Sequence, residues 1–451
     1  MKCSANICHR PYAPPTVKLD APYVCRLAPA EKAIALEWFD KGNGTDYRLF
    51  YTVRYANAWK SLAVTPGTMV IEGLERDTEY ELYIESDEGK RSNLRLARTG
   101  AIPPDTCVIN YLHPEDKQYQ FSGQYLCSPS LVKTESGRLI AGMDVFGPSM
   151  GQNTTLLFAS DDDGKSWHYL CDLYPFYWSS LFYHKHEIYI IGLTTEYGNL
   201  QISRSKDEGV TWEEPTTIMY GANLLCATGG ISREPMHLTE YQGRYYTSCA
   251  YGSWKTGGHL PAVLSVDVNA DLMKAKSWSC SEFLPFEGKW KEEAGIRGDA
   301  IEGNFVVAPD GKLYDYMRWK KGEMLKLRVN TDDPDAPMEY VGIEEAPTSN
   351  SMFRIIPHKD HYLLVSNRKS RVQEEYSRNC LSLFESKDLK EYTLVKDIIN
   401  MEDKSPRKFG FQYPTFVKDG NQLYLSIRSA FNDANSFHNS NYILFYRTTL
   451  D

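Results

Sequence analysis

The sequence lacks long apolar runs, paired cysteine motifs and clusters of basic residues. No stretch approaches the roughly 20 consecutive apolar residues that a helix needs to cross a bilayer. Its 10 cysteines are scattered along 451 residues and none forms a C-x-x-C pair, which argues against a disulfide framework and against a zinc site. With 50 Lys and Arg against 59 Asp and Glu, the formal charge is −9 and no basic run occurs. A nucleic-acid partner is therefore not expected.

The N-terminal residues also lack the hydrophobic segment of a secretory leader, since Met1 to Cys8 contain no apolar run. Together with the scattered cysteines, this favours a cytoplasmic protein, or an extracellular one if a leader has been removed. We expect no membrane partner, no cofactor and no metal ligand among the site residues, and leave a structural calcium ion open.

What the sequence does contain is apolar and aromatic side chains. Hydrophobic residues make up 42% of the chain, enough for a packed core, so wholesale disorder is excluded. Aromatic residues reach 13%, with 31 tyrosines, and this bias favours β-structure or surfaces that stack on planar ligands.

Short strand-like runs, separated by turn residues, follow a proline-rich segment at residues 1–14 that we expect to be an extended tail. About seven strands in about 85 residues is the pattern of a β-sandwich. We therefore predict a sandwich over residues 15–100 and a linker at 101–104. The predicted strands cover residues 33–38, 47–55, 60–64, 68–71, 79–85 and 92–98.

The segment from Leu74 to Tyr80 resembles the tyrosine corner of fibronectin type III domains, and Trp38 occupies the place of that family's core tryptophan. The resemblance implies a fibronectin type III-like sandwich in which the hydroxyl of Tyr80 bonds to the backbone just upstream. We find no charged cluster here, so we expect a spacer or docking module, through which a homo-oligomer could form.

Two segments beyond residue 105 share the pattern S-x-D-x-G-x-[ST]-W: Ser160 to Trp167 and Ser205 to Trp212, 45 residues apart. They resemble the Asp-box, or BNR repeat, of sialidase-like β-propellers, which implies a tight hairpin with a capping Asp, a Gly at positive φ and a packed Trp. A weaker version spans residues 386–392, one residue short and without the Gly.

A second repeated unit, strand–turn–strand, occurs six times with turn residues where hairpins need them. Six units over residues 105–451 predict an all-β, six-bladed β-propeller, with residues 107–112 as a strand that closes the last blade. The six hairpins lie at residues 130–140, 181–189, 237–246, 305–314, 355–362 and 415–424.

Propeller topology separates the two faces, because each first strand starts, and each second strand ends, on the face opposite the Asp-box hairpins. We expect the site on that face, around the central funnel. Second-strand ends place Asp144, Arg318, Arg428 and either Asn367 or Arg368 there. First-strand starts and nearby loops add Trp178, Arg233, Glu234, His237, Glu302, Arg354, Gln412, Tyr413 and His438.

Several arginines in one funnel indicate an anionic ligand, because each guanidinium matches carboxylate or phosphate oxygens in pairs. The resemblance to sialidases implies an arginine triad, here Arg318, Arg428 and one of Arg354 or Arg368, with Arg233 as a further substrate-binding candidate. Phe353-Arg354-Ile355-Ile356-Pro357 is similar to the sialidase F/Y-R-I-P motif. It carries an extra Ile, however, and lies late in the chain, whereas sialidases have the motif before the first Asp-box.

Cleavage of a glycosidic bond generally needs two carboxyl groups. The catalytic candidates are Glu302 and Asp144, with Glu234 third. Sialidase-type enzymes instead use a Tyr nucleophile helped by a Glu, and Tyr413 and Tyr251 are candidates for it. Trp178 could stack on a sugar ring, and Gln412 and His438 are further binding candidates.

These observations favour an exo-acting glycoside hydrolase on an acidic or otherwise decorated glycan, with an anionic oligosaccharide as its partner. A uronate-specific polysaccharide lyase is an alternative, with His237 as the base and arginines that neutralise the carboxylate. A non-catalytic propeller that binds a glycan or a protein is the third hypothesis.

Overall fold

The regular secondary structure of the described chain is almost entirely β-strand, so the predicted all-β class is confirmed. One short α-helix, α1 (Gly288–Ala294), and one 3-10 turn, Ala275–Ser277, interrupt the strands within the described ranges, and none of the described helices is long and apolar enough to span a bilayer. The tail predicted for residues 1–14 lies outside the described residues. The computed structural model describes residues 20–222, 229–233, 236–254, 258–294, 300–432 and 434–450.

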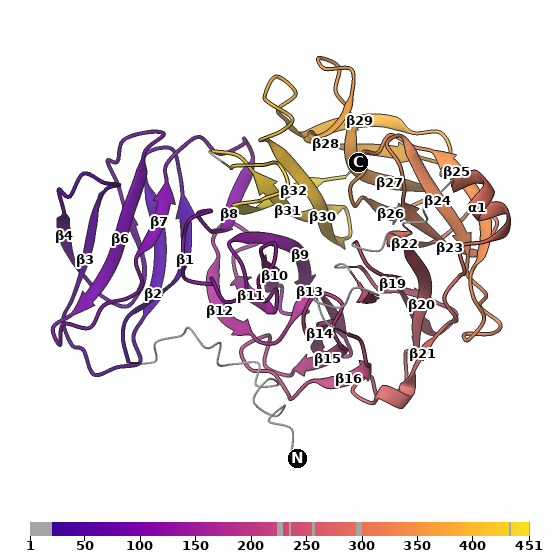
Figure 1. Ribbon diagram of the computed structural model, residues 1–451, viewed down its shortest axis with the longest axis horizontal. Helices are drawn as coiled ribbons and strands as arrows, with labels where there is room; N and C mark the ends of the chain where they lie inside the picture. The colour runs from indigo at the N-terminus through magenta and orange to yellow at the C-terminus, as the bar shows by residue number, and fades with distance from the viewer. Residues whose placement is uncertain are drawn as a thin grey trace.

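Two small sheets at the start of the described chain pack against each other and form a sandwich (Figure 1). Strand β6 alternates half-buried and buried residues, so Tyr80, Leu82 and Ile84 point into the shared core. The strand over residues 23–29 was not predicted. In sheet order the strands are β1 (Tyr23–Pro29), β2 (Ile34–Phe39) and β5 (Gly67–Ile71), then β4 (Lys60–Val64), β3 (Tyr47–Val53), β6 (Glu79–Ser86) and β7 (Arg95–Arg98).

The two residues that suggested a sandwich both lie in this core. The hydroxyl of Tyr80 accepts the backbone N–H of Glu75 at 2.8 Å, the bond expected of a tyrosine corner. Trp38 is buried, and its ring packs edge-on against Tyr47 with the centroids 4.9 Å apart. The sandwich is therefore anchored by the residues that the sequence pattern singled out.

Six further sheets follow and surround a common axis (Figure 1). In chain order, the first two are β9 (Tyr125–Lys133), β10 (Leu139–Phe146), β11 (Thr154–Ser160), β12 (His168–Leu173), and β13 (Tyr177–His184), β14 (Glu187–Leu193), β15 (Leu200–Ser205), β16 (Thr216–Met219). The third and fourth are β17 (Gly230–Ser232), β18 (Thr239–Tyr241), β19 (Arg244–Gly252), β20 (His259–Asp267), β21 (Trp278–Cys280), and β22 (Ile301–Val307), β23 (Leu313–Arg318), β24 (Glu323–Arg328), β25 (Glu339–Glu345). The last two are β26 (Arg354–His358), β27 (His361–Lys369), β28 (Tyr376–Ser386), β29 (Thr393–Asn400), and β30 (Gly410–Asp419), β31 (Gln422–Ala430), β32 (Tyr442–Thr449), β8 (Thr106–Tyr111).

The inner strands of these sheets are buried on both faces. Strand β10 reads Leu-Ile-Ala-Gly-Met-Asp-Val-Phe and every residue in it is buried, because neighbouring sheets cover both of its sides. Tight packing near the axis requires small residues: a Cβ on Gly142 would lie 2.6 Å from the hydroxyl oxygen of Ser130, and one on Gly192 would lie 2.5 Å from that of Ser179. The small residues let the inner strands crowd around the axis.

The hairpin between β11 and β12 shows why the repeated S-x-D-x-G-x-[ST]-W pattern folds as it does. The carboxylate of Asp162 accepts the backbone N–H of Ser166, four residues further on, at 2.9 Å and so closes the turn. Gly164 has φ 84°, and a Cβ there would lie 2.0 Å from the ring of Phe445, so only glycine fits. Trp167 is buried beneath the turn.

The same turn recurs in two other sheets. Asp207 accepts the backbone N–H of Thr211 at 2.8 Å, between β15 and β16. Asp388 accepts the backbone N–H of Lys390 at 2.9 Å, between β28 and β29. In this weaker repeat Leu389 adopts φ 62° near the place where the other two turns have glycine.

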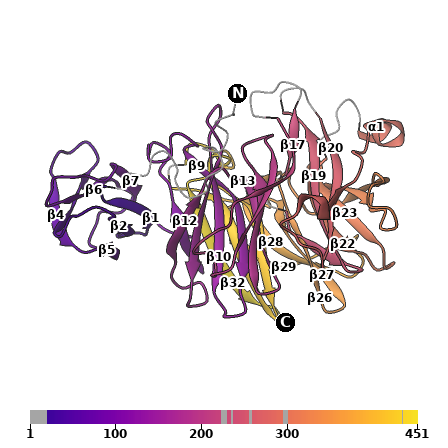
Figure 2. The ribbon, with the colours of Figure 1, turned by 90° about the horizontal axis from the view of Figure 1, so that it is seen from below.

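The sandwich is joined to the ring by buried polar contacts. Arg26 of β1 donates from Nε to the carbonyl of Ile109 at 2.7 Å and from Nη2 to that of Val108 at 2.9 Å, both on β8. Arg95 of β7 pairs with Asp116 at 2.6 Å, and both side chains are almost fully buried. The sandwich therefore rests on the flank of the ring at a defined position (Figure 2).

A buried carboxyl group lies in the same interface. The hydroxyl of Tyr23 donates to Asp172 of β12 at 3.1 Å and lies 3.0 Å from the hydroxyl of Tyr119. Burial raises the pKa of Asp172 to about 7. The proton that Asp172 holds in the folded protein is therefore linked to the contact between sandwich and ring.

The pH dependence of unfolding follows from the raised pKa of Asp172. A carboxyl group with a raised pKa stabilises the folded state below its unfolded pKa, and that contribution is lost as the pH rises through about 7. We expect Asp172 to contribute a fall on the order of 2 kcal/mol in the free energy of unfolding between about pH 5 and about pH 8. Asp172→Asn should make this part of the profile less steep by that amount, measured by denaturant unfolding.

The exposed Asp332 provides the matched control, because its side chain makes no hydrogen bond within the described chain. Asp332→Asn should leave the wild-type profile unchanged. An equally steep profile in Asp172→Asn would show that another group causes the pH dependence.

Candidate active site

Four of the strands nearest the axis are irregular close to their first residues. The pairing register shifts in β9, β13, β22 and β30, and at each shift one non-glycine residue adopts a left-handed conformation. Such bulges turn a side chain away from its regular direction and concentrate at functional sites. The four residues are Ser128 (φ 46°), Trp178 (φ 49°), Glu302 (φ 58°) and Tyr413 (φ 53°).

All four side chains line one cavity of about 420 Å³ at the mouth of the axis. Arg318 and Arg428 also line it, from the ends of β23 and β31, as does Arg378 from the start of β28. The cavity thus lies on the face that the propeller topology predicted for the site.

Glu302 and Tyr413 form the centre of the cavity. The hydroxyl of Tyr413 donates a short hydrogen bond to Oε1 of Glu302. Arg318 donates from Nη1 to the same oxygen at 2.8 Å and to the hydroxyl of Tyr413 at 3.0 Å. Glu302 is 2% exposed, so this carboxylate, phenol and guanidinium form a nearly buried unit.

The residue after Glu302 explains part of this geometry. A Cβ on Gly303 would lie 2.2 Å from a carboxylate oxygen of Asp315. Glycine therefore lets β22 pass close to β23 at the point where the bulge directs Glu302 into the cavity.

Arg378 and Arg428 both contact the ring of Tyr413, with their guanidinium carbons 5.9 Å and 5.0 Å from its centroid. Burial and the charge of Glu302 raise the pKa of Tyr413, against the opposing effect of the arginines. The phenol is therefore protonated at neutral pH, and Glu302 is the group placed to accept its proton.

Three arginines give the cavity a positive character. Burial, and then the charge of Arg318, lower the pKa of Arg378 to about 10, as expected for a cation held among cations. The side chain of Gln412 and the carbonyl of Asn350 accept hydrogen bonds from Arg378. An anion bound among these guanidinium groups would relieve their repulsion.

A second carboxylate lines the cavity at Glu196, in the loop after β14. Its Oε2 accepts the side-chain N–H of Gln152 at 2.6 Å, and Oε1 of Gln152 accepts the hydroxyl of Tyr177 at 3.1 Å. Gln152 has φ 47°. This chain of bonds fixes Glu196 on the wall formed by Trp178.

Aromatic rings and a histidine form the rest of the wall. The guanidinium of Arg428 lies 4.8 Å from the centroid of Phe146, whose ring meets that of His438 edge-on at 5.4 Å. Burial, and then the charge of Arg428, lower the pKa of His438, so its imidazole is neutral at neutral pH. Trp178 and the half-exposed Trp254 complete an apolar side.

Asp144 is not among the residues of the cavity, contrary to prediction. It is fully buried behind the bulge of β13, where it accepts the hydroxyl of Thr155 at 2.5 Å and the backbone N–H of Ser179 at 3.2 Å. Burial raises the pKa of Asp144 to about 8. Asp144 therefore supports the strand that carries Trp178.

Arg368 also lies away from the cavity, so it is not the third arginine. It pairs with Asp397 at 2.7 Å and with Glu402 at 3.0 Å, both near the outer edge of its sheet. The irregular register near the end of β27, where Asn367 pairs with Leu381 and Lys369 with Tyr376, explains the error.

Arg233 and Arg354 are fully buried below the cavity. Arg233 donates to the hydroxyl of Ser180 at 3.0 Å, and Arg354 donates to the sulfur of Met236 at 3.7 Å. Burial lowers the pKa of Arg354 to about 9, against the opposing charge of Glu302. Arg354 therefore interacts electrostatically with Glu302 from beneath the cavity.

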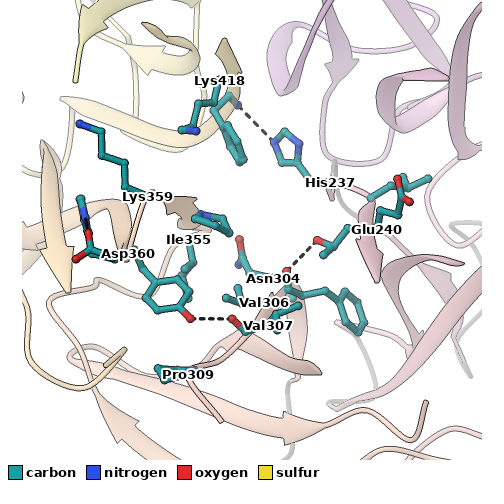
Figure 3. A pocket seen from close by; sticks show the side chains of 18 of the residues that line it. His237, Glu240, Asn304, Val306, Val307, Pro309, Ile355, Lys359, Asp360 and Lys418 are labelled. Atoms are coloured by element: carbon teal, nitrogen blue, oxygen red, sulfur yellow. Dashed lines mark hydrogen bonds and ion pairs between the residues drawn. The ribbon is translucent and has the colours of Figure 1, made fainter. Parts of the chain in front are cut away.

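His237 lines a different cavity, of about 710 Å³, at the other end of the axis (Figure 3). Its Nε2 lies 3.1 Å from the hydroxyl of Thr415 and accepts the backbone N–H of Phe416 at 3.4 Å. Burial and the nearby arginines hold the pKa of His237 well below its usual value. It is thus separated from Glu302 and is not placed as a lyase base. Glu234 lies outside the described residues.

Of the site residues predicted from the sequence, those that line the cavity are Glu302, Tyr413, Arg318, Arg428, Trp178 and His438. Gln412 lies beside it and accepts a hydrogen bond from Arg378. The prediction did not include Arg378 and Glu196, which also line the cavity. Arg378 begins a third strand, and third strands also start on the site face, so the topology contained this signal. Glu196 lies in a loop between second and third strands and has no periodic signal. The described residues contain no group of three or more His, Cys, Asp or Glu side chains placed to hold a metal ion.

A family model described as a BNR repeat-like domain matches residues 179–425, more than half of the chain. The chain belongs to this family. A search of the curated proteins found no match.

Solved structures similar to this member of the BNR repeat-like family show a common fold. An α-L-arabinanase of Penicillium chrysogenum with arabinobiose has TM-score 0.51 and 12% identity, over 77% of this chain and 98% of that chain. A Hadza microbial sialidase has TM-score 0.52 and 13% identity, over 98% and 95%. A variant of the NanB sialidase of Streptococcus pneumoniae has TM-score 0.50 and 9% identity, over 96% and 93%. The fold is a sialidase-like β-propeller.

The contrast between Arg378 and Arg368 gives a test of the anion site. Arg378→Met removes a cation from among cations, so stability should change little, whereas Arg368→Met leaves two carboxylates unpaired and should cost about 3 kcal/mol. Glucuronate and N-acetylneuraminate should raise the melting temperature of the wild type and of Arg368→Met, but not that of Arg378→Met. Equal ligand-induced shifts in both variants would contradict the assignment.

Proposed function

We propose that this BNR repeat-like protein is an exo-acting, retaining glycoside hydrolase that removes an acidic sugar from the end of a glycan. The observation that carries the proposal is the Tyr413–Glu302–Arg318 unit, which lies beside Arg378 and Arg428 in one cavity. A Tyr–Glu pair is one of the known nucleophile arrangements of retaining glycosidases. The glycosidase neighbours in fold support the same class.

The arginines bind the carboxylate of the terminal sugar in this proposal. Arg378 and Arg428 flank Tyr413, and Arg318 bridges to Glu302. A carboxylate held by paired N–H donors is fixed in orientation as well as position. With the sugar ring oriented in this way, its anomeric carbon is presented to the hydroxyl of Tyr413.

The chemistry then proceeds in two steps. The phenol oxygen of Tyr413 attacks the anomeric carbon as its proton passes to Glu302, while Glu196 gives a proton to the departing glycosidic oxygen. In the second step water, deprotonated by Glu196, attacks the anomeric carbon. The bond between that carbon and the oxygen of Tyr413 breaks, and Glu302 returns its proton to the phenol oxygen. Protons and bonds balance over the cycle, and the configuration at the anomeric carbon is retained.

We further propose the domain organisation that fits this function. Residues 15–100 form a fibronectin type III-like module, and residues 105–451 form a six-bladed propeller that holds the catalytic cavity. The support is the Glu75–Tyr80 bond in the module and the six sheets around the axis.

Replacing the nucleophile is the direct test. Tyr413→Phe keeps the ring beside Arg378 and Arg428 but removes the attacking oxygen. We therefore expect kcat to fall by about a thousandfold or more and the melting temperature to change little. The assay is release of 4-methylumbelliferone from its N-acetylneuraminide, glucuronide and galacturonide. Arg368→Lys, distant from the cavity, is the control. Lack of wild-type turnover on all acidic substrates, or full activity of Tyr413→Phe, would overturn the proposal.

The role of Glu196 predicts a dependence on the leaving group. Glu196→Gln should lower kcat/KM by about a hundredfold or more for natural glycosides, whose alkoxide needs a proton, and far less for nitrophenyl glycosides, whose phenolate leaves without one. A uniform loss over a series of leaving groups would assign Glu196 to binding instead of acid catalysis.

A further inference from the structure

A third space, a groove larger than the two cavities on the axis, lies where the sandwich meets the ring. It has a volume of about 1000 Å³, at the upper end of the range for small-ligand sites. Strands β6 and β7 of the sandwich, the segment before β7 and Arg54, which follows β3, form one side. The segment between β8 and β9 forms the floor, and Asn435, in the loop after β31, forms the far side.

This groove lies next to the catalytic cavity. Tyr125 lines the groove and its ring packs on that of Phe146, which lines the cavity, with the centroids 5.4 Å apart. The hydroxyl of Tyr125 accepts the side-chain N–H of Asn435 at 3.2 Å. These side chains lie between the two spaces, and both spaces are bordered by the start of β9 and by residues at or after the end of β31.

Amide side chains dominate the polar lining of the groove. Asn93, Gln120 and Gln124 line it, and their side chains form no hydrogen bond with any described part of the chain. A carboxamide offers two donors and one acceptor without charge. Sugar hydroxyls, which both donate and accept, match that set.

The charged side chains of the groove cancel one another. Arg54 pairs with Glu79 at 2.8 Å and with Glu115 at 2.7 Å, and Lys117 and Glu81 contribute opposite charges. The groove therefore lacks the positive character of the catalytic cavity, which has three arginines. Its chemistry suits neutral sugars rather than a second acidic one.

Apolar surface lies beside the amides. Leu94 is 47% exposed, and Leu96 and Tyr125 complete an apolar strip. The carbon–hydrogen faces of pyranose and furanose rings cover such surfaces, while their hydroxyls reach the neighbouring amides.

The groove has a fixed shape because the sandwich is docked by buried contacts. Arg95 and Asp116 form a buried ion pair under its floor, and the side chain of Gln118 donates to the carbonyl of Val24 at 3.0 Å. Because the groove is already formed, little free energy is lost in ordering its side chains when a ligand binds.

We propose that this groove binds the neutral sugar residues that follow the terminal acidic sugar of the substrate. The sandwich is in this view part of the glycan-binding surface of the enzyme. The inference rests on the proposed function for the identity of the terminal sugar, but the groove's affinity for neutral sugars stands on its own lining.

The test is the double variant Asn93→Ala/Gln120→Ala, which removes two amides that the protein itself does not use. Each lost hydrogen bond is expected to weaken binding a few-fold, so affinity for longer glycans should fall about tenfold. The probes are sialyllactose, glucuronoxylotriose and a glycan array of neutral oligosaccharides of two to four sugars, measured by calorimetry and array binding. Free N-acetylneuraminate and glucuronate are the short probes.

The matched control is Asn43→Ala, an exposed amide in the turn before β3, at the other end of that strand from Arg54. We expect Asn43→Ala to bind every probe as the wild type does. The double variant should bind free N-acetylneuraminate and glucuronate with the affinity of the wild type. It should no longer bind the longer glycans more tightly than these single acids.

The arms of the experiment separate the two proposals. If the wild type binds the neutral array, and the double variant does not, the groove is supported even where no acidic glycoside is turned over. If acidic glycosides are cleaved but longer glycans bind no better than the single acids, the groove assignment is overturned and the catalytic one stands. Unchanged binding of longer glycans by the double variant, or dimer formation lost with it, would also overturn the groove assignment.

Discussion

Closure of the ring by β8 is the constraint on which the rest of the structure depends. β8 is the first strand after the sandwich, yet it pairs with β32, the last strand of the chain. The carbonyls of Val108 and Ile109 in the same strand accept hydrogen bonds from the guanidinium of Arg26. One strand thus joins the two ends of the ring to each other and to the sandwich, and the closed ring brings the starts of its inner strands to one mouth.

The parts of the fold that depend on local chemistry could be predicted from the sequence. The turns at Asp162 and Asp207 depend on residues within the same eight positions, so their pattern is readable. Glu302 and Tyr413 could be placed because each begins a first strand, and Arg318 because it ends a second strand. Topology converts such positions into proximity without any knowledge of side-chain geometry.

The rest depended on geometry that leaves no local signal. The bulges at Trp178 and Glu302 place non-glycine residues at positive φ, which no turn residue marks. The irregular pairing register near the end of β27 directs Arg368 away from the cavity. Asp144 is buried behind the cavity instead of lining it. The contacts that dock the sandwich, such as Arg95 with Asp116, are single long-range pairs between segments that show no repeat.

Buried side chains close the candidate active-site cavity on the side away from the mouth of the axis. In the described chain, Met236 and Met352 pack against Tyr413, and Arg233 and Arg354 are buried beside them. These side chains separate the cavity at the mouth from the one at the opposite end of the axis. A molecule that binds in this cavity therefore enters and leaves through the same opening at the mouth, rather than passing along the axis.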